Sequence, residues 1–225
     1  MKPVSDIRNC DCMDYMASVT DKFFDLAIVD PPYGIGAGKM TMGSGVKHWS
    51  KSNWDSKILN MDYFNSLFRV SKNQIIWGGN YFTEYLPPKR GWLSWNKEVP
   101  NGMSFADFEL AWTSFDMSSR EIRIKYSGSV VQGKYEIKIH PTQKPVALYV
   151  WLLKNYAKQG DRIFDSHLGS GSSRIAAYKL GFDFYATEID ETCFNEQEKR
   201  FRKACFNEIE ITKRQVVTQK SLFDN

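Results

Sequence analysis

The stretch from residue 162 to residue 190 limits the fold most, because it predicts strand, glycine turn, helix, strand and acid in that order. Its first strand leads into the turn Gly169-Ser170-Gly171. A helical pattern follows, and the second strand ends at Glu188. Such a unit places two parallel strands side by side with a helix between them. We therefore expect an α/β protein with an open, mostly parallel sheet.

A second strand of this kind ends in an unusual way. The apolar run Leu26 to Val29 is short and partly β-branched, as is typical of a buried parallel strand, and Asp30-Pro31-Pro32-Tyr33 follows it. Two consecutive prolines cannot continue a strand or a helix, so the chain must leave the sheet directly after a carboxylate. Open α/β sheets bind their ligands at these carboxyl ends of strands.

The same four residues suit the binding of a flat base that has an exocyclic amino group. The Asp30 carboxylate and the Pro31 carbonyl both accept hydrogen bonds, and an amino group offers two donors. Tyr33 offers an aromatic face, on which a stacked base gains roughly 1–3 kcal/mol. The alternative is a strand end at which Asp30 caps a turn, and these four residues alone do not separate the two readings.

Together the motifs resemble those of the DNA amino-methyltransferases, which methylate adenine or cytosine amino groups with S-adenosylmethionine (AdoMet). The resemblance covers most of residues 1–206 and is carried by Asp30-Pro31-Pro32-Tyr33, His140-Pro141-Thr142-Gln143-Lys144-Pro145, Gly169-Ser170-Gly171-Ser172 and Glu188-Ile189-Asp190. The first motif precedes the others, an order that resembles the β class of this family. The resemblance implies a Rossmann-like AdoMet-dependent methyltransferase fold, with helices on both sheet faces and a small inserted target-recognition segment.

The resemblance implies that Asp30, Pro31, Pro32 and Tyr33 are catalytic and act on the N6 amino group of an adenine flipped out of duplex DNA. Cytosine-specific members more often have Ser at the position of Asp30, which favours adenine. Methylation of cytosine N4 is the alternative within the family, and RNA is a third substrate class.

The resemblance also assigns a cofactor site. Its candidate residues are Asp11, Cys12, Asp30, His140, Thr142, Lys144, Asp165, His167, Gly169, Gly171, Ser172, Glu188 and Ile189. In this assignment the glycine turn holds the methionine carboxylate, Glu188 the ribose and Ile189 the adenine. Thr142 and Lys144 complete the methionine pocket, and Thr142 is also expected to cap the following helix. Asp11, at a strand-to-helix junction, either bonds the adenine or caps its own helix.

Two observations bear on rival readings of this site. NAD(P) would suit the glycine turn and Glu188, but Arg174 stands where the third glycine of a dinucleotide fingerprint belongs. The family usually has Pro and Phe where this chain has Ser166 and His167. His167 can take the place of the aromatic wall, but it is polar and histidine titrates near neutral pH, so the pocket geometry and its pH dependence need not follow the family's pattern. This departure keeps open a catalytically silent AdoMet- or DNA-binding module.

We expect one catalytic domain over residues 1–206 and a polar tail over residues 207–225. The stretch 34–57 is rich in Gly, Ser and Lys without hydrophobic periodicity, which predicts a mobile loop over the substrate or a solvated loop. Residues 108–113 alternate as a later strand, expected at an antiparallel edge of the sheet, and the polar stretch 116–139 predicts an inserted basic hairpin. The resemblance implies that the segment of about 98–139 reads the target sequence; a solvated β-insertion is the alternative. The segment is short, so either the recognised sequence is short or a homodimer supplies the rest. The candidate DNA contacts are Lys39, Lys47, Lys51, Arg120, Arg123 and Lys125.

Composition sets outer limits on function. Of 225 residues, 42% are hydrophobic and 25% are charged, which is typical of soluble globular proteins. A net charge of +4 permits nucleic-acid binding without demonstrating it. The four cysteines lack the spacing of metal ligands, and the longest apolar run is too short to span a bilayer. We expect a cytoplasmic enzyme of bacterial or phage origin, without a metal or a membrane partner, in restriction–modification or in epigenetic or phage-borne marking.

Overall fold

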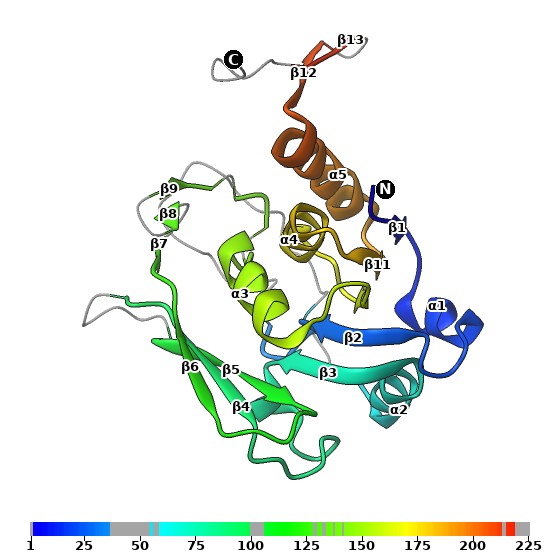
Figure 1. Cartoon of the computed structure of the whole chain (residues 1–225), viewed down its shortest axis with the longest axis vertical. Helices are drawn as coiled ribbons and strands as arrows, with labels where there is room; N and C mark the ends of the chain where they lie inside the picture. The colour runs from blue at the N-terminus through cyan, green and yellow to red at the C-terminus, as the bar shows by residue number, and fades with distance from the viewer. Residues whose placement is uncertain are drawn as a thin grey trace.

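The computed structural model describes residues 2–36, 55, 59–99, 106–127, 130–131, 134–136, 138–140, 142–212 and 215–218. Its main sheet has eight strands in the order β1-β11-β10-β2-β3-β5-β4-β6 (Figure 1). Their bounds are β1 (Ser5–Arg8), β2 (Phe24–Val29), β3 (Ser71–Trp77), β4 (Trp92–Asn96), β5 (Phe108–Thr113), β6 (Arg120–Arg123), β10 (Arg162–Asp165) and β11 (Asp183–Thr187). The neighbours from β1 to β3 are all parallel, so a mostly parallel sheet is confirmed.

The helices connect these strands. They are α1 (Cys12–Ser18), α2 (Met61–Val70), the 3₁₀ helix η2 (Gly79–Tyr81), α3 (Val146–Tyr156), α4 (Ser172–Leu180) and α5 (Glu191–Phe206). Two small antiparallel sheets stand apart from the main sheet: β7 (Tyr126–Ser127), β8 (Val130–Val131) and β9 (Lys134–Tyr135) form one, and β12 (Glu208–Thr212) and β13 (Gln215–Thr218) form the other.

Two hydrophobic cores lie on opposite faces of the sheet, because successive side chains of a strand point to opposite sides. On β2, Leu26 and Ile28 belong to the core that α3 and α4 complete. Ala27 and Val29 belong to the core that α1 and α2 complete. Helices therefore cover both faces, as expected, and α3 and α4 lie side by side in Figure 1.

Short-range signals set most helix starts. Asp11 caps α1, since its side chain accepts from the Met13 N–H at 2.7 Å, and Asp190 caps α5. The expected cap at Thr142 is wrong. Helix α3 begins after Pro145, and its first free N–H, on Val146, donates to the distant Glu136 carboxylate at 3.3 Å.

Residues 108–113 form the expected antiparallel strand, but β5 lies inside the sheet, between β3 and β4, and not at its edge. The hairpin expected over residues 116–139 is wrong for part of its length, because β6 adds to the edge of the main sheet, parallel to β4. Because Ile122 and Ile124 are buried while the charged residues around them are exposed, β6 fits a half-buried edge strand. Among the described residues of this stretch, β7, β8 and β9 form a separate small sheet. Within the helices described, none combines the length and apolarity needed to cross a membrane.

Candidate functional site

The two sequence motifs meet at one edge of the sheet. Strand β2 is parallel to β10, and β10 is parallel to β11, with Leu26 opposite Ile163 and Asp165 opposite Ala186. Asp30 follows β2 and Glu188 follows β11, so both leave the sheet at its carboxyl edge. Neighbouring strands lie about 4.8 Å apart, which puts these two segments, separated by one strand, roughly 10 Å apart.

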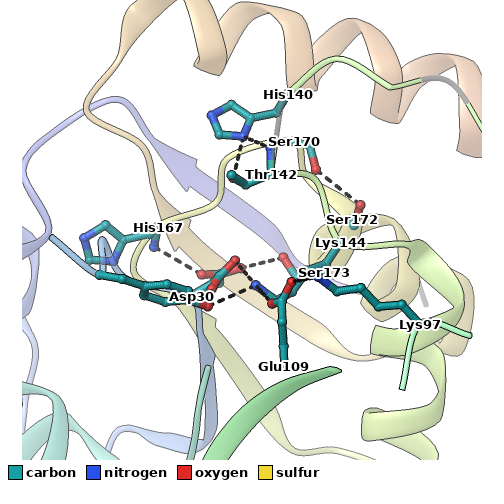
Figure 2. A network of polar contacts seen from close by, with 12 residues as sticks. Asp30, Lys97, Glu109, His140, Thr142, Lys144, His167, Ser170, Ser172 and Ser173 are labelled. Atoms are coloured by element: carbon teal, nitrogen blue, oxygen red, sulfur yellow. Dashed lines mark hydrogen bonds and ion pairs between the residues drawn. The ribbon is translucent and has the colours of Figure 1, made fainter. Parts of the chain in front are cut away.

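Asp30 is held by two donors. The Tyr33 hydroxyl donates to its Oδ1 at 2.5 Å, and the Lys144 ammonium donates to its Oδ2 at 2.5 Å. The Lys144 side chain, 4% exposed, also forms an ion pair with Glu109 of β5 at 3.0 Å. Glu109 in turn pairs with Lys97, just after β4, at 2.6 Å. Figure 2 shows this row of alternating charges.

The charges stabilise one another. Burial alone would raise the pKa of Glu109, but the ammonium groups of Lys144 and Lys97 outweigh burial and lower that pKa to about 2. Burial likewise opposes the charge of Lys144, yet the carboxylates of Asp30 and Glu109 raise its pKa. Burial and the neighbouring Asp30 raise the pKa of Tyr33 well above its ordinary value. Glu109 and Lys144 are therefore charged and Tyr33 is a hydrogen-bond donor at neutral pH.

Gly78, directly after β3, sets the position of the Tyr33 ring. It has a φ of +69°, and a Cβ there would lie 2.2 Å from the Tyr33 Cε1 atom. The Tyr81 ring stacks on Tyr33, with centroids 5.0 Å apart and planes 18° apart. Neither residue was predicted from the sequence, although the pair Gly78-Gly79 at the end of a neighbouring strand was a usable signal.

The glycine turn follows β10 and opens α4. The Gly169 N–H donates to Glu188 Oε2 at 2.8 Å, which joins the turn to the acid after β11. Asp165 lies beneath the turn and accepts from the Ser173 hydroxyl at 2.6 Å. Burial raises the pKa of Asp165 to about 7, so this carboxyl is partly protonated at neutral pH. Asp165 therefore supports the turn from inside the sheet.

The residues around the turn suit AdoMet. Ile189 is 68% exposed although it is apolar, and it directly follows Glu188, whose pKa burial raises. An exposed apolar side chain beside a carboxylate matches an adenine and its ribose hydroxyls. Thr142 and His140 lie together, with the Thr142 Oγ1 and His140 Nδ1 atoms 3.0 Å apart.

His167 belongs to a buried polar group. The Tyr63 hydroxyl lies 2.7 Å from Ser166 Oγ, which lies 2.8 Å from His167 Nδ1, and Cys12 Sγ lies 4.0 Å from the other ring nitrogen. Burial lowers the pKa of His167 to about 4. The expectation of a titration near neutral pH is therefore wrong, because a charged imidazole would lose its hydration there without gaining a carboxylate partner.

A buried arginine links the glycine turn to the segment before α3. Arg200 of α5, 5% exposed at its side chain, donates to the Ser170 carbonyl at 2.6 Å and to Ser172 Oγ at 2.9 Å. Its other terminal nitrogen donates to Glu136 at 2.6 Å. Nothing local in the sequence predicted this bridge, because its two ends lie far apart in the chain.

The candidate DNA-contact residues divide into two groups. Arg120, Arg123 and Lys125 are exposed on or just after the edge strand β6. Lys39, Lys47 and Lys51 lie outside the described residues, as does most of the expected loop. Among the described residues, no cluster of three or more His, Cys, Asp or Glu could hold a metal ion.

Comparisons with known proteins agree with this arrangement. The family model for DNA methylases, N6_N4_Mtase, matches residues 74–199. Type II methyltransferase M2.MboI of Moraxella bovis is 23% identical over 241 residues, covering 87% of this chain and 86% of that protein. Type II methyltransferase M.HinfI of Haemophilus influenzae is 25% identical over 262 residues, covering 92% of this chain and 72% of that protein.

Solved structures share the fold. The crystal structure of the M1.HpyAVI–SAM complex superposes with a TM-score of 0.57 at 17% identity, covering 87% of this chain and 98% of that chain. The PvuII DNA methyltransferase, described as cytosine-N4-specific, gives a TM-score of 0.55 at 12% identity, covering 89% of this chain and 94% of that chain. At these identities the likeness concerns the fold alone.

Proposed function

Because the chain belongs to the family of AdoMet-dependent DNA methylases, we propose that it transfers a methyl group to the N6 amino group of adenine in duplex DNA. The observation that supports this most is the Asp30 carboxylate, which lies at the same sheet edge as the glycine turn and is fixed by Tyr33 and Lys144. The presence of Asp rather than Ser at this position favours adenine over cytosine.

In this proposal Asp30 and the Pro31 carbonyl accept hydrogen bonds from the target amino group and direct the nitrogen lone pair toward the methyl donor. Bound AdoMet would supply a methyl group activated by its sulfonium, with the thioether of the cofactor as the leaving group. The carboxylate also stabilises the positive charge that develops on the nitrogen, which then loses a proton. Orientation and electrostatics suffice for this reaction.

The target base must leave the duplex, at a cost of a few kcal/mol. Tyr33 and Tyr81 form a stacked aromatic pair, and Tyr81 is 41% exposed, so the pair offers a surface for a planar base. The basic residues Arg120, Arg123 and Lys125 then contact phosphates along the β6 edge, within a target-recognition segment over residues 98–139 of the proposed catalytic domain.

The test is methyl transfer from labelled AdoMet to DNA of varied sequence, followed by nucleoside analysis. We expect N6-methyladenine from the natural protein and none from Asp30→Ala, with AdoMet binding retained in both. N4-methylcytosine as the product would replace the adenine assignment by the other branch of the family, to which the PvuII structure belongs. AdoMet binding without transfer to any DNA would instead indicate a silent binding module.

A further inference from the structure

A buried ammonium joins the catalytic motif to a strand that the motif does not include. Lys144 lies between two carboxylates, 2.5 Å from Asp30 and 3.0 Å from Glu109. Asp30 follows β2, whereas Glu109 belongs to β5, on the far side of β3. Because the Lys144 side chain is almost fully buried, these carboxylates replace water as the partners of its charge.

The other groups that face Lys144 are aromatic. Its Nζ donates to the Tyr33 hydroxyl at 3.2 Å and lies 5.4 Å from the centre of the Trp77 ring of β3. Tyr149, a buried residue of α3, lies near enough for both carboxylates to raise its pKa, after burial itself. The cationic partner of Glu109 on its outer side is Lys97. Within the part of the chain that the structure describes, Asp30 and Glu109 are thus the anions that hold Lys144.

This arrangement leaves Asp30 able to accept further hydrogen bonds. A carboxylate has about four lone-pair positions, and the Tyr33 hydroxyl and Lys144 occupy two of them. Since Lys144 is shared with Glu109, its charge is not directed at Asp30 alone. If Glu109 were neutral, the ammonium would be drawn wholly to Asp30 and would weaken it as an acceptor for the amino group.

We propose that Glu109 is a positioning residue for methyl transfer: it anchors Lys144 from the side opposite Asp30 and so fixes the Asp30 carboxylate in the orientation that receives the target amino group. This inference rests on the proposed function and deepens it. Glu109 acts through Lys144 and does not touch the base.

If Glu109 holds Lys144, replacing Glu109 should change the pH dependence of methyl transfer. Burial disfavours the ammonium, and Asp30 and Glu109 together overcome burial and raise its pKa. In Glu109→Gln, Asp30 is the anionic partner of Lys144 that remains among the described residues. Lys144 should then lose its proton at a lower pH than in the natural protein, and activity should fall at that lower pH as well.

The experiment compares Glu109→Gln with Glu109→Asp and with Glu196→Gln, an exposed glutamate of α5 that serves as the matched control. In single-turnover methyl transfer at pH 7.5, we expect Glu109→Gln to be about 10- to 100-fold slower, with AdoMet affinity unchanged. Glu109→Asp should recover part of the rate, and Glu196→Gln should match the natural protein. A rate for Glu109→Gln equal to that of the natural protein overturns the proposal.

A second measurement does not depend on activity. With ¹³C-labelled lysine, the Lys144 side-chain resonance is followed by NMR as pH is raised. The midpoint of its titration should lie at a lower pH in Glu109→Gln than in the natural protein or in Glu196→Gln. An unchanged midpoint overturns the inference that Glu109 holds Lys144. If the natural protein methylates no DNA, the proposed function fails, and this titration alone decides whether the Glu109–Lys144 contact holds.

Discussion

Replacing Gly78 by alanine should disable the site through Tyr33. The added Cβ would lie 2.2 Å from Tyr33 Cε1, whereas carbon atoms prefer separations of about 3.5–4.0 Å, so the ring must move by about 1.3–1.8 Å. Such a shift breaks the 2.5 Å bond from the Tyr33 hydroxyl to Asp30. Since a misplacement of about 1 Å can cost 100-fold in rate, we expect a single-turnover rate constant roughly 100-fold lower, equivalent to about 2.7 kcal/mol.

Gly160→Ala is the matched control, because Gly160 also has a positive φ, +91°, but nothing lies within 4 Å of its Cβ position. Both substitutions incur the left-handed backbone strain of about 1–2 kcal/mol, which urea unfolding measures. Only Gly78→Ala should lose methyl transfer. A Gly78→Ala protein with the natural rate constant, or a Gly160→Ala protein equally slowed, would refute the role of Gly78 in placing Tyr33.

Three further predictions concern the charged and polar groups around the site. Glu136→Gln leaves the buried Arg200 without its anionic partner and should lower the free energy of unfolding by about 3 kcal/mol; a loss below 1 kcal/mol in urea unfolding would contradict it. The folded-state pKa of Glu109 is lowered from 4.5 to about 2, so its contribution to stability is present above pH 4.5 and is lost as pH falls through about 2. The stability difference between the natural protein and Glu109→Gln should therefore shrink as pH is lowered from 5 to 2, and a constant difference would be evidence against the low pKa. His167→Phe should leave the pH dependence of the transfer rate between pH 6 and 8 unchanged, because His167, with a pKa of about 4, is already neutral there; a shifted profile would show that His167 titrates in that range.

Local patterns in the sequence were sufficient to predict the α/β framework of parallel strands and connecting helices. The order of strand, glycine turn, helix, strand and acid over residues 162–190 predicted parallel strands, and β10, α4 and β11 follow that order. Asp11 and Asp190 cap helices as side chains of their type do at such junctions. These features depend on residues within a few positions of one another, so a single sequence contains the information.

Local patterns failed where contacts with, or burial by, other parts of the chain decide the structure. Glu136, not Thr142, accepts from the first free N–H of α3. The residues of β6 join the main sheet because the edge of β4 was available to them, which no local pattern reveals. His167 titrates far below neutral pH because burial, not its residue type, fixes its pKa.

The sequence by itself determined the family, the strand-end carboxylate Asp30 and the glycine turn, since each depends on neighbouring residues in the chain. Only the tertiary structure decided what surrounds Asp30: Glu109 brought to Lys144 by strand order, and Gly78 placed against Tyr33 by the pairing of β2 with β3. The physical reason is that electrostatic and steric effects act over a few ångströms in space, whatever the separation along the chain.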